Sequence, residues 1–271
     1  MQWHEIHAAL PLPLLESTYN FLWPFINGIT IEKKEGAFLL KAFLFVKDPG
    51  DLVSKLKRFL RIQGKSFQAD YSEPALRKTD LASANYFVIV PAPASHVPPS
   101  GIPIFIQRGR SFGIGSHPCT VYCLQALRDI LGQPGRIRSV MDAGTGTGIL
   151  AVAASKLGAS DITAVEIVQD AVMEAVDNVK LNGAEEAVRV LHGSVTDTAG
   201  TYDLVLANLY GTLLEEIAPL LVDRISPAGW IVLGGMTALQ SDRVISAYVR
   251  HGLLERSRLC DEEWCTAVLA R

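Results

Sequence analysis

Three glycines lie between a predicted strand and a predicted helix at residues 140–150, in the sequence VMDAGTGTGIL. Gly144, Gly146 and Gly148 permit a tight turn and let a ligand approach the backbone, and the helix that follows presents free N–H groups. Glu166 ends the next predicted strand, where its carboxylate can accept hydrogen bonds from both hydroxyls of a ribose. The pattern therefore predicts a binding site for a nucleotide-like cofactor.

The spacing of these glycines distinguishes between cofactors. The chain has G-x-G-x-G with Asp142 before it, whereas G-x-G-x-x-G is the pattern that holds a dinucleotide pyrophosphate. S-adenosylmethionine carries no phosphate, and a carboxylate beside its positive groups would be favourable. We therefore expect S-adenosylmethionine and not a dinucleotide. The alternative interpretations are a glycine-rich strand-to-helix turn and, for Glu166, a solvated carboxylate at a strand end.

Two further segments place polar and aromatic residues beside predicted elements. The loop SFGIGSHPCT, residues 111–120, contains Phe112 and leads into a helix that begins near Thr120. The segment ANLY, residues 207–210, ends a strand on the side where ligands bind in open α/β sheets. The amide oxygen of Asn208 could accept a hydrogen bond from an attacking amine and orient its lone pair. A capping histidine in the loop and an Asx turn at the strand end are the structural alternatives.

The elements around these motifs predict two domains. Residues 1–75 follow the order β-α-β-β-α-β of a small ferredoxin-like α+β domain, with Asp48 and Pro49 starting its second helix. Residues 76–110 are dense in proline and small residues, which predicts a linker. Residues 111–271 alternate strands and helices, which predicts a Rossmann-like, mostly parallel seven-stranded sheet with a C-terminal antiparallel hairpin. The expected strands are 3–10, 29–36, 37–46 and about 66–71, then 139–143, 162–167, 188–193, 202–208 and 230–234, with the hairpin at 253–259 and 264–271.

Composition limits the classes of function. The chain has 271 residues, of which 49% are hydrophobic and 20% charged, as in a soluble globular protein of about two domains. No apolar run approaches the ~18 residues of a membrane span, and no basic stretch precedes an apolar core at the N-terminus, so we expect a cytoplasmic protein. The four cysteines are too few and too irregularly spaced for a disulfide framework or a CxxC zinc site, and we expect reduced thiols.

The charge distribution argues against nucleic-acid binding. The net charge is −3, although residues 1–75 carry nine Lys and Arg against eight Asp and Glu. Five basic residues of this region gather on its second helix, and ferredoxin-like domains often bind RNA. A net charge of +1 and the absence of an aromatic RNP-type strand favour a solvated helix face instead.

Taken together, FGIGSHPCT, DAGTGTGIL, VEIVQDAV, DLVLANL, GWIVLGG and EEWC resemble the ribosomal protein L11 methyltransferase (PrmA) family over about residues 105–271. The resemblance implies a class I methyltransferase domain, an N-terminal ferredoxin-like domain that recognises the substrate, and methylation of lysine side-chain and N-terminal amines of a ribosomal protein. The chain departs from the family pattern at four positions. Ile114 and Cys119 stand where the family usually has Thr, Thr145 stands where it often has Cys, and Tyr210 stands where it usually has an aliphatic residue. The Trp-rich charged segment that normally precedes the methyltransferase domain is absent from residues 76–105.

These observations assign the expected roles. The predicted catalytic residues are Asn208, which orients the amine, and Phe112 and Tyr210, which form walls of the pocket; no metal and no dedicated side-chain base are expected. The alternatives are a methyltransferase of the same fold acting on another protein or a small molecule, or an inactive RNA- or protein-binding module. The predicted cofactor-binding residues are Phe112, Gly113, Thr120, Asp142, Gly144, Thr145, Gly146, Gly148, Ile149, Glu166, Ile167, Ser194 and Asn208, with Asp197 as a second candidate on the adenine side.

Overall fold

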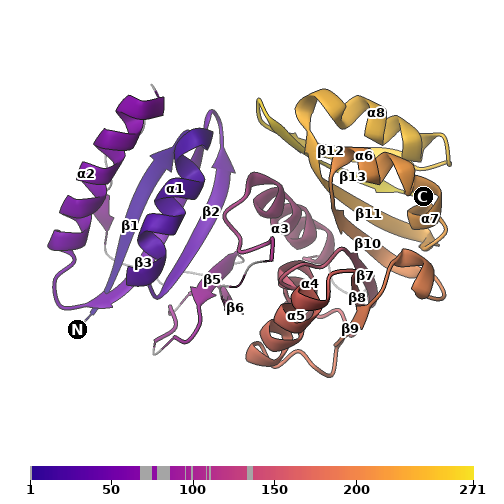
Figure 1. Cartoon of the computed structure of the whole chain (residues 1–271), viewed down its shortest axis with the longest axis horizontal. Coiled ribbons are helices and arrows are strands. Elements are labelled where there is room, and N and C mark those ends of the chain that lie inside the picture. The colour runs from indigo at the N-terminus through magenta and orange to yellow at the C-terminus, as the bar shows by residue number, and fades with distance from the viewer. Residues whose placement is uncertain are drawn as a thin grey trace. The chain divides into compact units, whose positions relative to one another are not determined.

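The chain folds into two compact units (Figure 1). The computed structural model describes residues 2–67, 75–77, 86–94, 96–98, 100–107, 109, 111–132 and 137–271. One unit consists of Met1–Arg108 with Gly115–His117, and the other of Gly109–Ile114 with Pro118–Arg271. Among the described helices, none combines the length and apolar character needed to cross a membrane.

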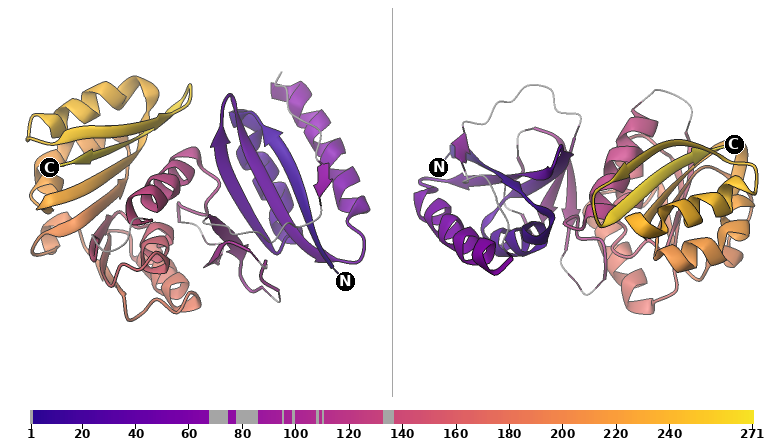
Figure 2. Two further views of the ribbon diagram at one scale, coloured as in Figure 1. Left: turned by 180° about the vertical axis from the view of Figure 1, so that it is seen from behind. Right: turned by 90° about the horizontal axis from the view of Figure 1, so that it is seen from above.

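The first unit is a six-stranded sheet with two helices on one of its faces (Figure 2). The strand order is β4-β1-β3-β2-β5-β6, antiparallel except for the parallel pair β5 and β6. Alternate residues of β1, namely Ile6, Ala8 and Leu10, are fully buried, as expected of a strand with one face on a core. The elements are β1 (Gln2–Leu10), α1 (Leu12–Leu22), η1 (Trp23–Phe25), β2 (Gly28–Lys34), β3 (Ala37–Val46), α2 (Gly50–Phe67), β4 (Ala75–Arg77), β5 (Phe87–Pro91) and β6 (Ile102–Ile106).

Two sequence predictions for this unit are wrong. The expected linker at 76–110 contains β5 and β6, which extend the first sheet. Their short apolar runs, FVIVP and IPIFI, form strands because the prolines fall at a strand end and on an edge strand, where no ladder hydrogen bond is lost. The strand predicted around 66–71 is wrong at residues 66 and 67, which belong to α2, and residues 68–71 lie outside the described part of the chain. The fourth strand of the structure is Ala75–Arg77.

The second unit is a seven-stranded sheet with helices on both faces (Figures 1 and 2). The order is β12-β13-β11-β10-β7-β8-β9; all neighbours are parallel except β13, which runs antiparallel to both β11 and β12. The predicted doubly wound sheet with a C-terminal hairpin is confirmed, and β11 is longer than predicted. The strands are β7 (Ser139–Ala143), β8 (Asp161–Glu166), β9 (Val188–His192), β10 (Tyr202–Asn208), β11 (Ile225–Thr237), β12 (Leu254–Cys260) and β13 (Trp264–Ala270).

One continuous apolar core holds this sheet to the helices on one of its faces. Val205 of β10, Ile231 and Leu233 of β11, and Tyr248 are fully buried members of that core. Burying a large apolar side chain contributes about 1.5–3 kcal/mol, so the core fixes β10 and β11 firmly against each other. The helices are α3 (Pro118–Leu131), α4 (Ile149–Lys156), α5 (Gln169–Leu181), η2 (Val195–Asp197), α6 (Gly211–Glu216), α7 (Ala218–Val222) and α8 (Ala238–Val249).

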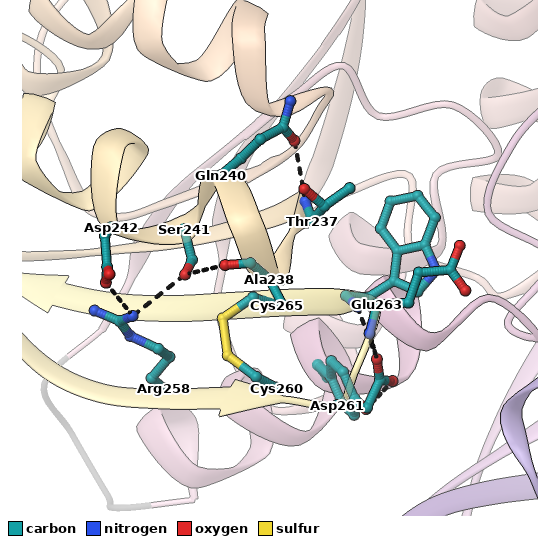
Figure 3. Close-up of a disulfide and its surroundings, with 12 residues drawn as sticks. Thr237, Ala238, Gln240, Ser241, Asp242, Arg258, Cys260, Asp261, Glu263 and Cys265 are labelled. Carbon is teal, nitrogen blue, oxygen red and sulfur yellow. Dashed lines mark hydrogen bonds and ion pairs between the residues drawn. A yellow bond between two sulfur atoms is a disulfide. The ribbon is translucent and has the colours of Figure 1, made fainter.

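The prediction of four reduced cysteines is also wrong. Cys260 and Cys265 are paired residues of β12 and β13, and the structure joins them in a disulfide (Figure 3). Their register across the hairpin brings the two sulfur atoms together, and their spacing in the sequence did not indicate that register. Cys119 and Cys123 are buried thiols of α3, as predicted.

Candidate active site

The candidate site residues come from the ends of adjacent parallel strands. Ala143 at the end of β7 pairs with Val165 of β8 on one side and with Ala207 of β10 on the other. Each strand then continues into a residue singled out by the sequence. The fold therefore brings the glycine loop, Glu166 and Asn208 to one edge of the sheet.

The glycine loop is tightly packed. The N–H of Gly144 donates to the carbonyl of Val165 at 2.9 Å. A Cβ at Gly144 would overlap the side chain of Leu209, and one at Gly146 would lie 2.5 Å from the carbonyl oxygen of Phe112. Both glycines also have positive φ angles, 72° and 56°, so any side chain would be strained. Gly148, at φ 82°, starts α4 in the same left-handed conformation.

Glu166 is oriented by backbone donors. Its carboxylate accepts hydrogen bonds from the N–H groups of Gly146 at 3.1 Å, Ile167 at 2.9 Å and Val168 at 3.0 Å. A carboxylate offers about four acceptor positions, and Oε1 already accepts two of these bonds and Oε2 one, so Oε2 keeps one position for a further donor such as a ribose hydroxyl. The side chain of Ile167 is 68% exposed and forms an apolar surface next to this carboxylate.

Asp142 lies beneath the glycine loop, only 1% exposed. Thr145 donates its hydroxyl to this carboxylate at 2.6 Å, and the N–H of Ala151 also donates to it. Burial raises the pKa of Asp142 to about 6, and these hydrogen bonds only partly offset it. Asp142 thus supports the loop directly, and its contact with a cofactor remains a prediction.

The loop that precedes α3 is tied to the glycine loop through Thr147, a residue that the sequence analysis missed. The Thr147 N–H donates to the Phe112 carbonyl at 3.1 Å, and its hydroxyl donates to the Gly113 carbonyl at 2.6 Å. Asn178 of α5 in turn donates to the Thr147 carbonyl at 2.9 Å. Only its position inside the G-x-G-x-G pattern could have singled out Thr147. The Phe112 side chain is 53% exposed, while Gly115–His117 belong to the first unit.

Asn208 presents a buried acceptor that lacks a donor. Its Nδ2 donates to the Oγ1 of Thr120 at 3.4 Å, and Thr120 is fully buried in the first turn of α3. Among the described residues, the buried Oδ1 of Asn208 has no hydrogen-bond partner. Leaving such an acceptor unpaired costs about 1–3 kcal/mol, so a native structure retains it only for a reason. Tyr210, two residues further on, is 79% exposed.

Ser194 and Asp197 bond to each other in a helix cap. Asp197 Oδ2 accepts from the Ser194 N–H at 2.7 Å, and the Ser194 hydroxyl accepts from the Thr196 N–H at 3.3 Å. The preceding residue, Gly193, donates its N–H to the Glu166 carbonyl at 2.9 Å. The turn is thus held beside Glu166, and an adenine-side role for Ser194 stays a prediction. Ile149, also predicted to bind the cofactor, is buried in the first turn of α4.

The strand order, the glycine loop and the acidic strand end define a methyltransferase-like α/β domain. Within the described residues, no cluster of His, Cys, Asp and Glu could hold a metal ion. The sequence profile of the ribosomal protein L11 methyltransferase (PrmA) family matches residues 81–271. The chain belongs to this family and is a protein methyltransferase.

Relatives of the chain agree with this assignment. It is 31% identical over 301 residues to a ribosomal protein L11 methyltransferase of Geotalea uraniireducens (strain Rf4), covering 97% of this chain and 96% of that protein. The corresponding protein of Syntrophotalea carbinolica is 36% identical over 166 residues, 61% of this chain and 54% of that one. A crystal structure of ribosomal protein L11 methylase from Lactobacillus delbrueckii subsp. bulgaricus has a TM-score of 0.62 at 24% identity, over 70% of this chain and 96% of that one. This last match shows the fold.

Proposed function

We propose that this protein transfers methyl groups from S-adenosylmethionine to lysine side-chain and N-terminal amines of ribosomal protein L11. The observation that carries the proposal is the unpartnered Oδ1 of Asn208, a buried acceptor at the same sheet edge as the glycine loop and Glu166. An amine of the substrate supplies the missing donor. The relatives are named for activity on this ribosomal protein.

The residues present fit S-adenosylmethionine. Glu166 Oε2 offers an acceptor position for a ribose hydroxyl, and the exposed Ile167 offers an apolar surface for an adenine ring. Gly144, Gly146 and Gly148 add no side chains of their own between a ligand and the loop backbone, while Leu209 packs against Gly144. Asp142 contributes a negative charge next to the loop, which favours a cation there. When bound, the cofactor supplies an electrophilic methyl group on a sulfonium.

The protein's own residues orient the amine. A lysine amine with an ordinary pKa of about 10.4 is mostly protonated at neutral pH, so the site must favour the neutral form by excluding water. Asn208 Oδ1 then accepts one N–H and directs the nitrogen lone pair towards the methyl carbon. This lone pair would take the methyl group of a cofactor held by the glycine loop and Glu166, and the methylated amine would lose its proton once the product is back in water. Phe112 and Tyr210 are proposed to line the approach.

We further infer that the first unit is a ferredoxin-like domain that recognises the substrate. Its β1-α1-β2-β3-α2-β4 order with the sheet order β4-β1-β3-β2 supports the fold assignment. In this proposal the recognition domain continues through β6 to Arg108, because β5 and β6 add to the same sheet. A ribosomal substrate implies that the protein works in the cytoplasm.

Purified protein, S-adenosylmethionine with a labelled methyl group and recombinant L11 test the proposal directly. We expect label in L11, located by peptide mass spectrometry at lysines and the N-terminus. A lysate from cells lacking the enzyme, treated in the same way, is the comparison for other substrates. Label in another protein and none in L11 would rule out L11 as the substrate while leaving the methyltransferase assignment intact.

The raised pKa of Asp142 predicts a pH-dependent cofactor affinity. Because burial holds this pKa at about 6, the carboxyl is partly protonated at pH 6, and a bound cation favours the ionised form. Binding should therefore release about half a proton per cofactor near pH 6 and almost none at pH 8, and affinity should fall below pH 6. Calorimetry in buffers of different ionisation enthalpy measures this release. Asp142→Asn should remove it, and equal release from the variant would contradict the assignment.

A further inference from the structure

Besides the contact of Thr120 with Asn208, helix α3 makes a second polar contact with the rest of the unit, through Tyr122. This side chain is fully buried, and its hydroxyl donates to Asp261 Oδ2 at 2.6 Å. The other oxygen, Asp261 Oδ1, accepts from the N–H groups of Glu263 at 2.8 Å and Trp264 at 2.7 Å. Both carboxylate oxygens are therefore engaged. A short hydrogen bond to a charged acceptor is stronger than a neutral one, so this contact ties α3 firmly to a turn 139 residues away.

The turn that carries Asp261 is closed at its base. Figure 3 shows Asp261 next to the disulfide between Cys260 and Cys265. The Asp261 N–H also donates to the Trp264 carbonyl at 3.0 Å. The disulfide, the backbone bond and the two bonds to Oδ1 restrict the turn, so the acceptor offered to Tyr122 has a defined position.

The same turn of α3 carries Thr120, the residue that contacts Asn208. In the part of the chain that the structure describes, the Asn208 amide makes one side-chain hydrogen bond, from Nδ2 to Thr120 Oγ1, and this bond is long at 3.4 Å. The Thr120 hydroxyl can donate as well as accept, so this contact fixes the position of the amide and does not by itself select which end faces the substrate. A small shift of Thr120 would displace the amide from the position at which Oδ1 can accept from the substrate amine.

We propose that Tyr122 is a positioning residue for methyl transfer. Its hydrogen bond to Asp261 fixes the start of α3, so that Thr120 holds the Asn208 amide in place at the substrate amine. This inference rests on the proposed function of Asn208. Tyr122 itself touches neither the substrate nor the cofactor.

Tyr122→Phe tests the proposal, because it removes only the hydroxyl. Tyr248→Phe is the matched control: Tyr248 is equally buried, and its hydroxyl donates to the Leu214 carbonyl at 2.8 Å. We expect Tyr122→Phe to lower kcat on L11 by about ten- to a hundredfold, as a small misplacement can, with the cofactor Kd unchanged within about twofold. Tyr248→Phe should lose a comparable amount of thermal stability and keep its kcat. Equal kcat values for the two variants would overturn the proposal.

A double-mutant cycle with Thr120→Val distinguishes positioning of Asn208 through Thr120 from a general loss of rigidity in the fold. If Tyr122 acts through Thr120, Tyr122→Phe should cause little further loss of kcat in the Thr120→Val background; losses that simply multiply would overturn the proposal. Asp261→Asn is the second variant and should lower kcat in the same direction, because it removes the charged acceptor. Wild-type protein that fails to methylate L11 would instead overturn the proposed function, and the inference with it.

Discussion

Asn208→Ala is expected to lose methyl transfer to L11 by at least about 10²–10³-fold in kcat, with binding of S-adenosylmethionine retained. The physical reason is that the variant removes the acceptor that orients the amine, while the glycine loop and Glu166 keep their backbone hydrogen bonds. Single-turnover measurements with saturating cofactor report the chemical step, and calorimetry reports the cofactor Kd.

Asn208→Asp provides the control for this result. It keeps the shape of the side chain and an acceptor oxygen, but places a charge in a buried position that would hold the amine as an ammonium. We expect the aspartate variant to be impaired at neutral pH and to recover part of its rate at higher pH. Wild-type rates for Asn208→Ala would remove Asn208 from the mechanism.

Glu166→Ala is expected to weaken S-adenosylmethionine binding by about ten- to a hundredfold. A hydrogen bond to a charged group contributes about 1.5–3 kcal/mol, and a ribose hydroxyl would form one with the remaining acceptor position of Oε2. The variant also loses the three backbone donors that Glu166 holds, including Gly146 of the glycine loop. Calorimetric titration with the cofactor measures the change.

Comparing Glu166→Gln with Glu166→Ala separates the effect of the charge on cofactor affinity from that of the acceptor oxygen. Glu166→Gln keeps one acceptor oxygen without the charge, so its affinity should fall between those of wild type and the alanine variant. Binding of NAD should be absent throughout, because the G-x-G-x-G spacing does not suit a pyrophosphate. An unchanged cofactor affinity in Glu166→Ala would show that the ribose is held elsewhere.

Local sequence signals predicted the second unit well. Strands β7 to β10 lie within a residue of their predicted limits, because each is an apolar run bounded by glycine or polar residues. Parallel strands end at one edge of a sheet, so the same reasoning also predicted that the glycine loop, Glu166 and Asn208 lie at one edge.

Other features depend on contacts that sequence reasoning did not foresee. The many prolines in residues 76–110 led to the prediction of a linker, although the segments of β5 and β6 are apolar. These two segments are strands because they pair with the first sheet, which the local sequence does not show. The hydrogen bond between Tyr122 and Asp261 joins residues 139 positions apart in the sequence, and neither residue type indicates which partner it will have. Asp142 was predicted as a cofactor ligand from its place before the glycines, whereas its burial and its bond to Thr145 depend on packing.

The position of β13 between β11 and β12 has a consequence for synthesis on the ribosome. Neither β11 nor β12 pairs with the other, so both wait for residues 264–270 to leave the exit tunnel before the sheet can close. Until then β11 exposes an unpaired edge, which is prone to aggregation. Helix α3 also packs on β13, so Thr120 and Asn208 can adopt their final arrangement only after this strand has left the exit tunnel. The nascent enzyme should therefore be inactive, and most dependent on chaperones, while β13 is still inside the ribosome.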